Sequence, residues 1–212
     1  TTFLKKFDES GDSCKPDIDL SEYGILAGIS ETIVSTGLDT PNAAPIGIIR
    51  RNQKTFVRIF KGSQTGENLV RQGVLVANVV YDPLLLVRST FFDIESSEFD
   101  FVDIGGKKFP VLKSAISWVA FKCTNLKNTE QTVVSDLIPL GAGFCEANRR
   151  ATPAPNRGFN AVLEATVHAT RYQLSGDKKY LELIRHYESL ASKCGGENEK
   201  KAMKLLYEVL GL

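Results

Sequence analysis

A short loop rich in glycine and hydroxyl side chains is the strongest candidate for chemistry in this sequence. It reads Lys61-Gly62-Ser63-Gln64-Thr65-Gly66-Glu67-Asn68 and precedes a short predicted helix. Gly62 and Gly66 allow a tight turn and a close approach to a ligand. Ser63 or Thr65 can cap the helix, whose first main-chain N–H groups then point outward. Such a helix start, with a lysine beside it, favours a phosphate; the alternative is an ordinary capped helix with a solvated Lys61.

The strand predicted before this loop carries a second positive charge. Thr55–Phe60 alternates, which puts Arg58 on the face opposite Val57 and Ile59, beside aromatic side chains. A surface arginine without a function would be poorly placed beside aromatic side chains. Arg58 is therefore predicted to contribute, with Lys61, to binding a phosphate. A nucleotide-binding Walker A loop is excluded, because a glutamate follows the second glycine where that motif needs lysine.

Other polar residues are weaker candidates. Glu164 and His168 stand four apart in a helical pattern, so they form either a proton relay near a ligand or an exposed helix pair. Asn148-Arg149-Arg150 and Asn156-Arg157 predict a solvated basic patch, with contact to an anionic substrate as the alternative. Trp118 is predicted to pack in the core or at an interface, with a place beside a ligand as the alternative.

Two regimes of composition must position these residues. From about Tyr23 to Pro139, short β-branched or aromatic runs are separated by Gly, Pro and Asn, which is typical of a β-barrel or sandwich. We predict strands at Gly24–Ser35, Ala43–Arg50, Thr55–Phe60, Gly73–Val80, Phe99–Phe101, Ala115–Asn125 and Thr132–Pro139, with a turn at Gly105-Gly106.

From Arg157 onward the pattern becomes helical. Apolar residues recur at three- and four-residue steps and predict three short amphipathic helices, the second of which ends at Cys194-Gly195-Gly196. Their apolar stripes must pack on one another, on the barrel or on a second subunit. We predict an N-terminal extension (1–20), a barrel domain (21–150) and a C-terminal helical domain (151–212), with Ala151–Asn156 as a stiff linker.

Composition narrows the class of protein. The 212 residues include 26 basic and 25 acidic ones, and 42% of the chain is hydrophobic, as in ordinary globular proteins. The charge is evenly spread and no apolar stretch reaches the roughly 20 residues of a membrane helix, so neither a nucleic-acid nor a membrane partner is predicted. The four cysteines lack CxxC spacing; we predict no metal site and a cytoplasmic location with reduced thiols.

Three segments resemble, in order, the flavin-binding strands and loop of the FMN-binding split β-barrel (flavin reductase-like) proteins. They are Thr40-Pro41-Asn42-Ala43-Ala44-Pro45-Ile46-Gly47, Ser63-Gln64-Thr65-Gly66-Glu67-Asn68-Leu69 and Val76-Ala77-Asn78-Val79. The nearest likeness is to an uncharacterised, mainly archaeal branch, the domain-of-unknown-function 447 family, which Asn160–Ala165 also resembles. The resemblance implies a mainly β (α+β) fold: an FMN-binding split β-barrel with a C-terminal three-helix portion.

Carried over to this chain, the resemblance implies an FMN site and a homodimer with flavin near the subunit interface. The phosphate would be held by Ser63, Thr65 and Asn68, with charge from Lys61 and Arg58 and the turn at Gly62. The isoalloxazine ring would lie beside the main chain of Asn42, Ala43, Ala44, Pro45 and Ile46. Asn78 either contacts the flavin or only closes a strand.

The activity implied is that of an FMN-dependent oxidoreductase, with hydride entering and leaving at flavin N5. A nicotinamide or another small molecule would donate the electrons, and the sequence identifies no catalytic side chain. The alternatives are a non-enzymatic FMN carrier or sensor, and a split-barrel interaction protein without a ligand. Only the resemblance favours FMN over FAD, riboflavin or the deazaflavin F420.

Overall fold

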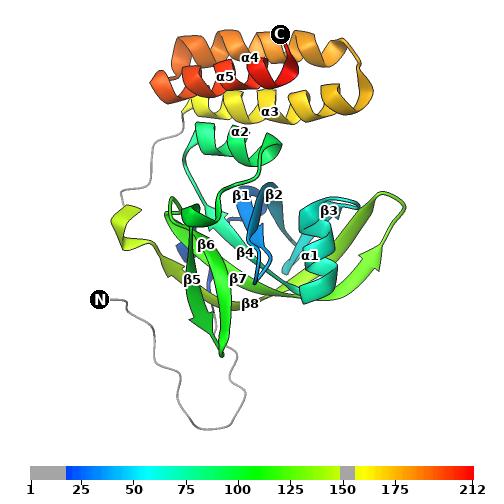
Figure 1. Cartoon of the computed structure of the whole chain (residues 1–212), viewed down its shortest axis with the longest axis vertical. Helices are drawn as coiled ribbons and strands as arrows, with labels where there is room; N and C mark the ends of the chain where they lie inside the picture. The colour runs from blue at the N-terminus through cyan, green and yellow to red at the C-terminus, as the bar shows by residue number, and fades with distance from the viewer. Residues whose placement is uncertain (1–17, 149–155) are drawn as a thin grey trace.

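The computed structural model describes residues 18–148 and 156–212 and has a closed six-stranded antiparallel barrel at its centre (Figure 1). The order around the barrel is β1-β2-β3-β8-β7-β4. The barrel strands are β1 (Gly28–Thr36), β2 (Asn42–Arg51), β3 (Lys54–Phe60), β4 (Val74–Val79), β7 (Ser117–Asn128) and β8 (Thr132–Phe144). The predicted mainly β fold is confirmed.

The remaining elements lie outside the barrel. A separate hairpin is formed by β5 (Phe99–Ile104) and β6 (Lys107–Leu112), and it turns at Gly105-Gly106 as predicted. The helices are α1 (Gln64–Gln72), α2 (Pro83–Phe91), α3 (Arg157–Ser175), α4 (Lys179–Cys194) and α5 (Glu197–Leu210). Short 3-10 turns lie at Leu20–Tyr23, Ser96–Glu98 and Glu146–Asn148. Among the described residues, no helix is both long and apolar enough to cross a membrane.

The barrel interior is a closed apolar core. It is lined by side chains from every strand, such as Val34, Ile48, Val57, Ile59 and Phe121, each no more than 1% exposed. Alternation along the strands directs these side chains inward, and Val57 and Ile59 lie on the same face of β3, as predicted. Their burial leaves no open interior, so a ligand must bind on the outside of the barrel.

A second core joins the outer face of the barrel to the β5–β6 hairpin. It includes Ile33, Val76, Phe109 and Trp118, so the predicted packing role of Trp118 is confirmed. Asn78 is fully buried, and its side-chain amide bonds to both the barrel and the hairpin. Its Nδ2 donates to the Ile33 carbonyl oxygen at 2.8 Å, and its Oδ1 accepts from the Leu112 main-chain N–H at 2.9 Å. Because an unsatisfied buried amide is costly, this pairing fixes the hairpin on the barrel.

The C-terminal helices pack on one another, and α2 joins them (Figure 1). Val87 of α2 lies in the same core as Ala165 of α3, Ile184 of α4 and Leu206 of α5. The sequence did not predict α2. By position it falls within the predicted barrel domain, yet it packs in the helical layer. Residues 151–155 of the predicted linker, together with 149–150 and 1–17, lie outside the described residues.

Two glycines bring α3 and α4 into close contact. A Cβ atom on Gly158, at the start of α3, would lie 2.4 Å from the Cα atom of Gly195, just after α4. Such a distance is far inside ordinary van der Waals contact, and the obstructing atoms are main chain that cannot rotate away. The contact therefore fixes how the two helices are staggered.

His168 is buried between α3 and α4. Its ring stacks on those of Tyr180 and Tyr187, with centroids 5.9 and 5.6 Å away, and its Nδ1 atom has no hydrogen-bond partner among the described residues. Burial, followed by the positive charge of Arg171, lowers the pKa of His168, and the charge of Glu164 opposes this. The imidazole is therefore held in its neutral form.

This burial predicts a pH-dependent stability. The unfolded chain binds a proton on His168 more tightly than the folded chain, because the unfolded pKa is about 6.5 and the folded one is lower. The contribution is thus complete above about pH 6.5 and is lost as the pH falls through the folded pKa. His168→Phe should reduce the fall in unfolding free energy on acidification, measured by denaturant titration. His186→Phe, at the exposed second histidine, should not; identical pH slopes for wild type and His168→Phe would contradict this.

Candidate functional site

The β3–α1 turn has the geometry of an anion-binding helix start. Ser63 is the N-cap of α1: its Oγ accepts from the Gly66 main-chain N–H at 3.2 Å and donates to the Phe60 carbonyl oxygen at 2.8 Å. Gly62 has a φ of 78°, a left-handed conformation that suits glycine. Gly66 is required as well, since a Cβ there would lie 2.8 Å from the Phe60 carbonyl oxygen.

Two buried side chains anchor this turn to the neighbouring strands. The Thr65 Oγ1 accepts from the Asn42 Nδ2 at 3.0 Å, which ties the first turn of α1 to the start of β2. The Asn68 Nδ2 donates to the Thr36 Oγ1 at 3.2 Å on β1. Thr65 and Asn68 are only 2% and 1% exposed. They therefore position the turn, and Asn68 in particular is already occupied within the protein.

The donors that remain available lie at the outer side of the turn. Among the described residues, none accepts from the main-chain N–H groups of Gln64 and Thr65, the first two of α1. Lys61, three residues before the helix, and Arg58, on β3, are both exposed. The Ser63 hydroxyl already donates to a carbonyl, so for an anion the main-chain N–H groups and the Lys61 ammonium are better placed.

The first half of β2 carries a second row of main-chain polar groups that have no hydrogen-bond partner among the described residues. It pairs with β1 from Asn42 to Arg50 but with β3 only from Ile48 to Arg51. The β2–β3 hairpin turns through two residues with positive φ, so the flanking residues exchange hydrogen bonds. Alternation then directs the main-chain polar groups of Ala43, Pro45 and Gly47 toward the missing partner. Pro45 fits this position, since it has no N–H to leave unpaired.

A cavity of about 340 Å³ lies where the turn and the start of β2 meet. Its lining includes Asn42 and Gln64, together with Asp93, Ile94 and Glu95 from the loop after α2. Its volume falls in the usual range for small-molecule sites, roughly 300–1,000 Å³. Gln64, the first residue of α1, is one of its lining residues.

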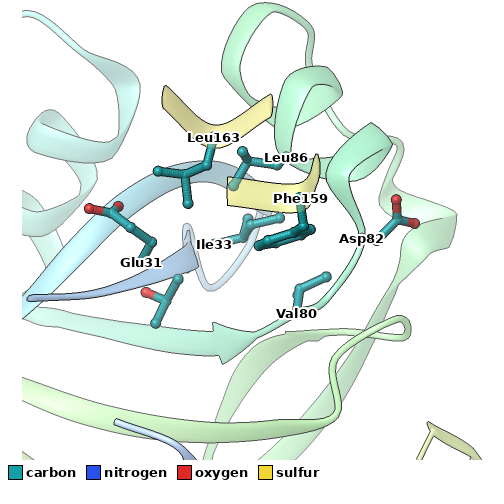
Figure 2. Close-up of a pocket in the computed structure, with 8 residues that line it drawn as sticks. Glu31, Ile33, Val80, Asp82, Leu86, Phe159 and Leu163 are labelled. Carbon is teal, nitrogen blue, oxygen red and sulfur yellow. The ribbon is translucent and has the colours of Figure 1, made fainter. Parts of the chain in front are cut away.

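A smaller cavity lies in the seam between barrel and helices. Figure 2 shows Phe159 and Leu163 of α3 and Leu86 of α2 gathered over Ile33 and Glu31 of β1. Its volume of about 60 Å³ corresponds to roughly two water molecules. That is too small for a cofactor, and we interpret it as a gap in the packing of the two layers.

The predicted pair of Glu164 and His168 does not form a relay. No hydrogen bond joins the two side chains, His168 lies between α3 and α4, and Glu164 is exposed. Glu164 instead influences Glu31, which the sequence analysis missed. Burial raises the pKa of the Glu31 carboxyl, and the Glu164 charge raises it further. This effect joins residues far apart in the chain and has no signal in a single sequence.

The structure separates the other predicted residues from the turn. Asn78 uses its amide to join β1 and β6, so it is the strand-closing alternative that fits. Asn148 donates to the Lys113 and Ala115 carbonyl oxygens, while Arg149 and Arg150 lie outside the described residues. Burial raises the pKa of Cys145, with a smaller effect from the charge of Asp100, which disfavours the nucleophilic thiolate.

The predicted site residues thus fall into two groups that do meet. Lys61, Gly62, Ser63, Thr65 and Asn68 form the turn, and Arg58 is exposed on the strand that precedes it. Asn42, Ala43, Ala44, Pro45 and Ile46 form the half of β2 that β3 leaves unpaired. The hydrogen bond between Asn42 and Thr65 connects the two groups. The loop at Asp93–Glu95 completes the wall, and the sequence analysis gave it no role.

Comparison with known proteins identifies related chains. A family model described as the N-terminal domain of a protein of unknown function (DUF447) matches residues 30–146, and a second DUF447 model matches residues 156–208. The crystal structure of an FMN-bound DUF447 protein from Methanosarcina mazei is 66% identical, with a TM-score of 0.87, and the match covers 90% of this chain and 100% of that one.

A more distant relative is an uncharacterised protein of Methanocaldococcus jannaschii. It is 27% identical over 197 residues, which cover 87% of this chain and 99% of that protein. The first family model alone spans more than half of the sequence, across the barrel strands and the β3–α1 turn. The chain therefore belongs to the DUF447 family.

Proposed function

We propose that this protein binds FMN, with the phosphate at the β3–α1 turn and the isoalloxazine ring along the unpaired half of β2. The observation that carries the proposal is the hydrogen bond between Asn42 and Thr65, because it holds a phosphate-binding turn against an open strand edge. The 66% identical relative was crystallised with FMN, which supports the same ligand here.

The groups at the turn suit the flavin phosphate. A phosphate monoester carries close to two negative charges at neutral pH, and the first N–H groups of α1 and the Lys61 ammonium offer charge-assisted hydrogen bonds. Arg58, exposed on the preceding strand, adds a positive charge. The Thr65 hydroxyl accepts from Asn42 and keeps its own proton to donate.

The edge of β2 suits the ring. Ala43 and Gly47 each offer an N–H and a carbonyl, and Pro45 offers a carbonyl, to the polar edge of a planar ligand. Small side chains at these positions let a flat ring approach the main chain closely. Bound there, FMN would supply hydride transfer at its N5 atom, and the protein would bind, orient and shield it. We therefore propose an oxidoreductase with a small-molecule electron donor, a nicotinamide being the first to test.

We also propose a homodimer formed through the outer face of β1, β2 and β3. Ile29, Ile49 and Phe56 are directly opposite one another across these strands and form one apolar row. Ile29 is 53% exposed, and Phe60 nearby on β3 is 66% exposed. A row of this kind beside the open half of β2 would bring the flavin near the interface between the two copies. The predicted cytoplasmic location stays a prediction.

The phosphate assignment predicts a selective loss of affinity. Lys61→Gln removes the ammonium at the turn and leaves the hydrogen bond between Asn42 and Thr65 intact, so FMN should bind roughly tenfold more weakly. Riboflavin lacks the phosphate, and its affinity should change little. Both affinities are measured by quenching of flavin fluorescence, with Lys107→Gln, at an exposed lysine of β6, as the matched control. An equal loss for both flavins would refute a phosphate contact at this turn.

The oxidoreductase assignment predicts that a nicotinamide reduces the bound flavin. Under anaerobic conditions, excess NADH or NADPH should bleach the visible absorbance of the FMN-loaded protein, and dithionite serves as the positive control. Bleaching by dithionite but by neither nucleotide would contradict a nicotinamide-linked enzyme and favour a carrier or sensor. Absence of FMN binding in the first place would exclude both.

The dimer predicts sensitivity to one charge on the apolar row. Ile29→Glu would bury a carboxylate in an apolar interface, which is costly without a partner, so the variant should run as a monomer in size-exclusion chromatography with light scattering. Leu174→Glu, at the 83% exposed end of α3, should leave the dimer intact. A monomeric wild type, or an unchanged Ile29→Glu dimer, would overturn the assignment of this face.

A further inference from the structure

The part of the 340 Å³ cavity wall that the loop after α2 forms is acidic. Asp93 and Glu95 flank Ile94, which is 6% exposed and packs in the core between hairpin and barrel. Burial of Ile94 turns its two neighbours outward, and both line the cavity. Among the described residues, no lysine or arginine forms an ion pair with either carboxylate. Their negative charge therefore faces whatever occupies the cavity.

The loop that carries these carboxylates is held firmly. Arg88 of α2 forms a 2.7 Å ion pair with Glu98, three residues beyond Glu95. The Glu98 main-chain N–H donates to the Glu95 carbonyl oxygen at 2.9 Å. These contacts and the burial of Ile94 hold the main chain of the loop, so both carboxylates stay attached at the edge of the cavity. The loop is thus a source of negative potential there.

We propose that Asp93 and Glu95 make the site selective for a flavin monophosphate by repelling the second phosphate of FAD. This inference rests on the proposed function, since it takes the flavin phosphate to lie at the start of α1. The cavity adjoins that start through Gln64 and Asn42, so it receives whatever extends beyond the first phosphate. In FMN nothing extends further. In FAD the second phosphate and the adenosine enter the cavity.

Charge, rather than size, makes this distinction. A volume of about 340 Å³ admits a group of small-molecule dimensions, so FAD is not excluded by lack of room. The first phosphate is compensated by the helix N–H groups and Lys61. The second would face two carboxylates, of which Glu95 also interacts at longer range with the charge of Arg88. Like charges at an interface disfavour the wrong ligand.

The test measures the affinities of the flavin-free full chain for FMN and FAD. Wild type should prefer FMN, and Asp93→Asn with Glu95→Gln should shift the FMN/FAD affinity ratio toward FAD by about fivefold, a size set by two exposed charges. Added salt should shrink the wild-type preference, because it screens exposed charges. Glu95→Lys should favour FAD more than Glu95→Gln does.

The control is Asp100→Asn with Glu130→Gln, which removes two exposed carboxylates outside the cavity wall and should leave the ratio unchanged. An unchanged ratio in the Asp93/Glu95 variant, or an equal shift in the control, would overturn the selectivity while leaving FMN binding standing. A wild type that binds both flavins equally would do the same. Failure of wild type to bind FMN would instead remove the proposed function, and the selectivity with it.

Discussion

Strand β2 is paired with β1 from Asn42 to Arg50, but it is paired with β3 only over its last four residues. This partial pairing is the constraint on which the site depends. If β3 continued alongside β2, the main chain at Ala43–Gly47 would be consumed by the barrel. Because β3 instead ends at Phe60 and the chain turns into α1, a helix start and an open strand edge are brought together. The barrel holds β2 in place, and the early end of its pairing with β3 leaves the main-chain groups of Ala43–Gly47 free of β3.

Much of the fold could be predicted because its signals are local. Short β-branched or aromatic runs identified β2 and β3 to within one residue of their ends, and Gly105-Gly106 marked the hairpin turn. Helix α2 was missed because Pro83–Val87 is a continuous apolar run without helical periodicity, and such a run is ambiguous between strand and helix. The Asp82-Pro83 pair, a capping residue followed by proline at the first helical position, was the available signal.

In the site, too, the features with a local sequence signal were predictable and those set by long-range contacts were not. The turn was predictable since glycine, capping serine and lysine act within a few residues of one another. The role of Asn42–Ile46 came from family resemblance alone, because it depends on where β3 stops pairing. Thr65 and Asn68 were expected at the phosphate, whereas the partners that bury them, Asn42 and Thr36, lie 23 and 32 residues away in sequence. Contacts of that span are set by tertiary packing and have no local pattern.

Helix α2 has a mechanical consequence that follows from its two attachments. Its Val87 is packed among α3, α4 and α5, and the close contact of Gly158 with Gly195 prevents α3 from sliding along α4. The helices therefore move as one block, and α2 moves with them. Its C-terminal end continues directly into the loop of Asp93–Glu95. The helical layer is thus mechanically coupled to the cavity through α2. A displacement of α4 or α5 would shift α2 and, with it, the loop of Asp93–Glu95 that lines the cavity.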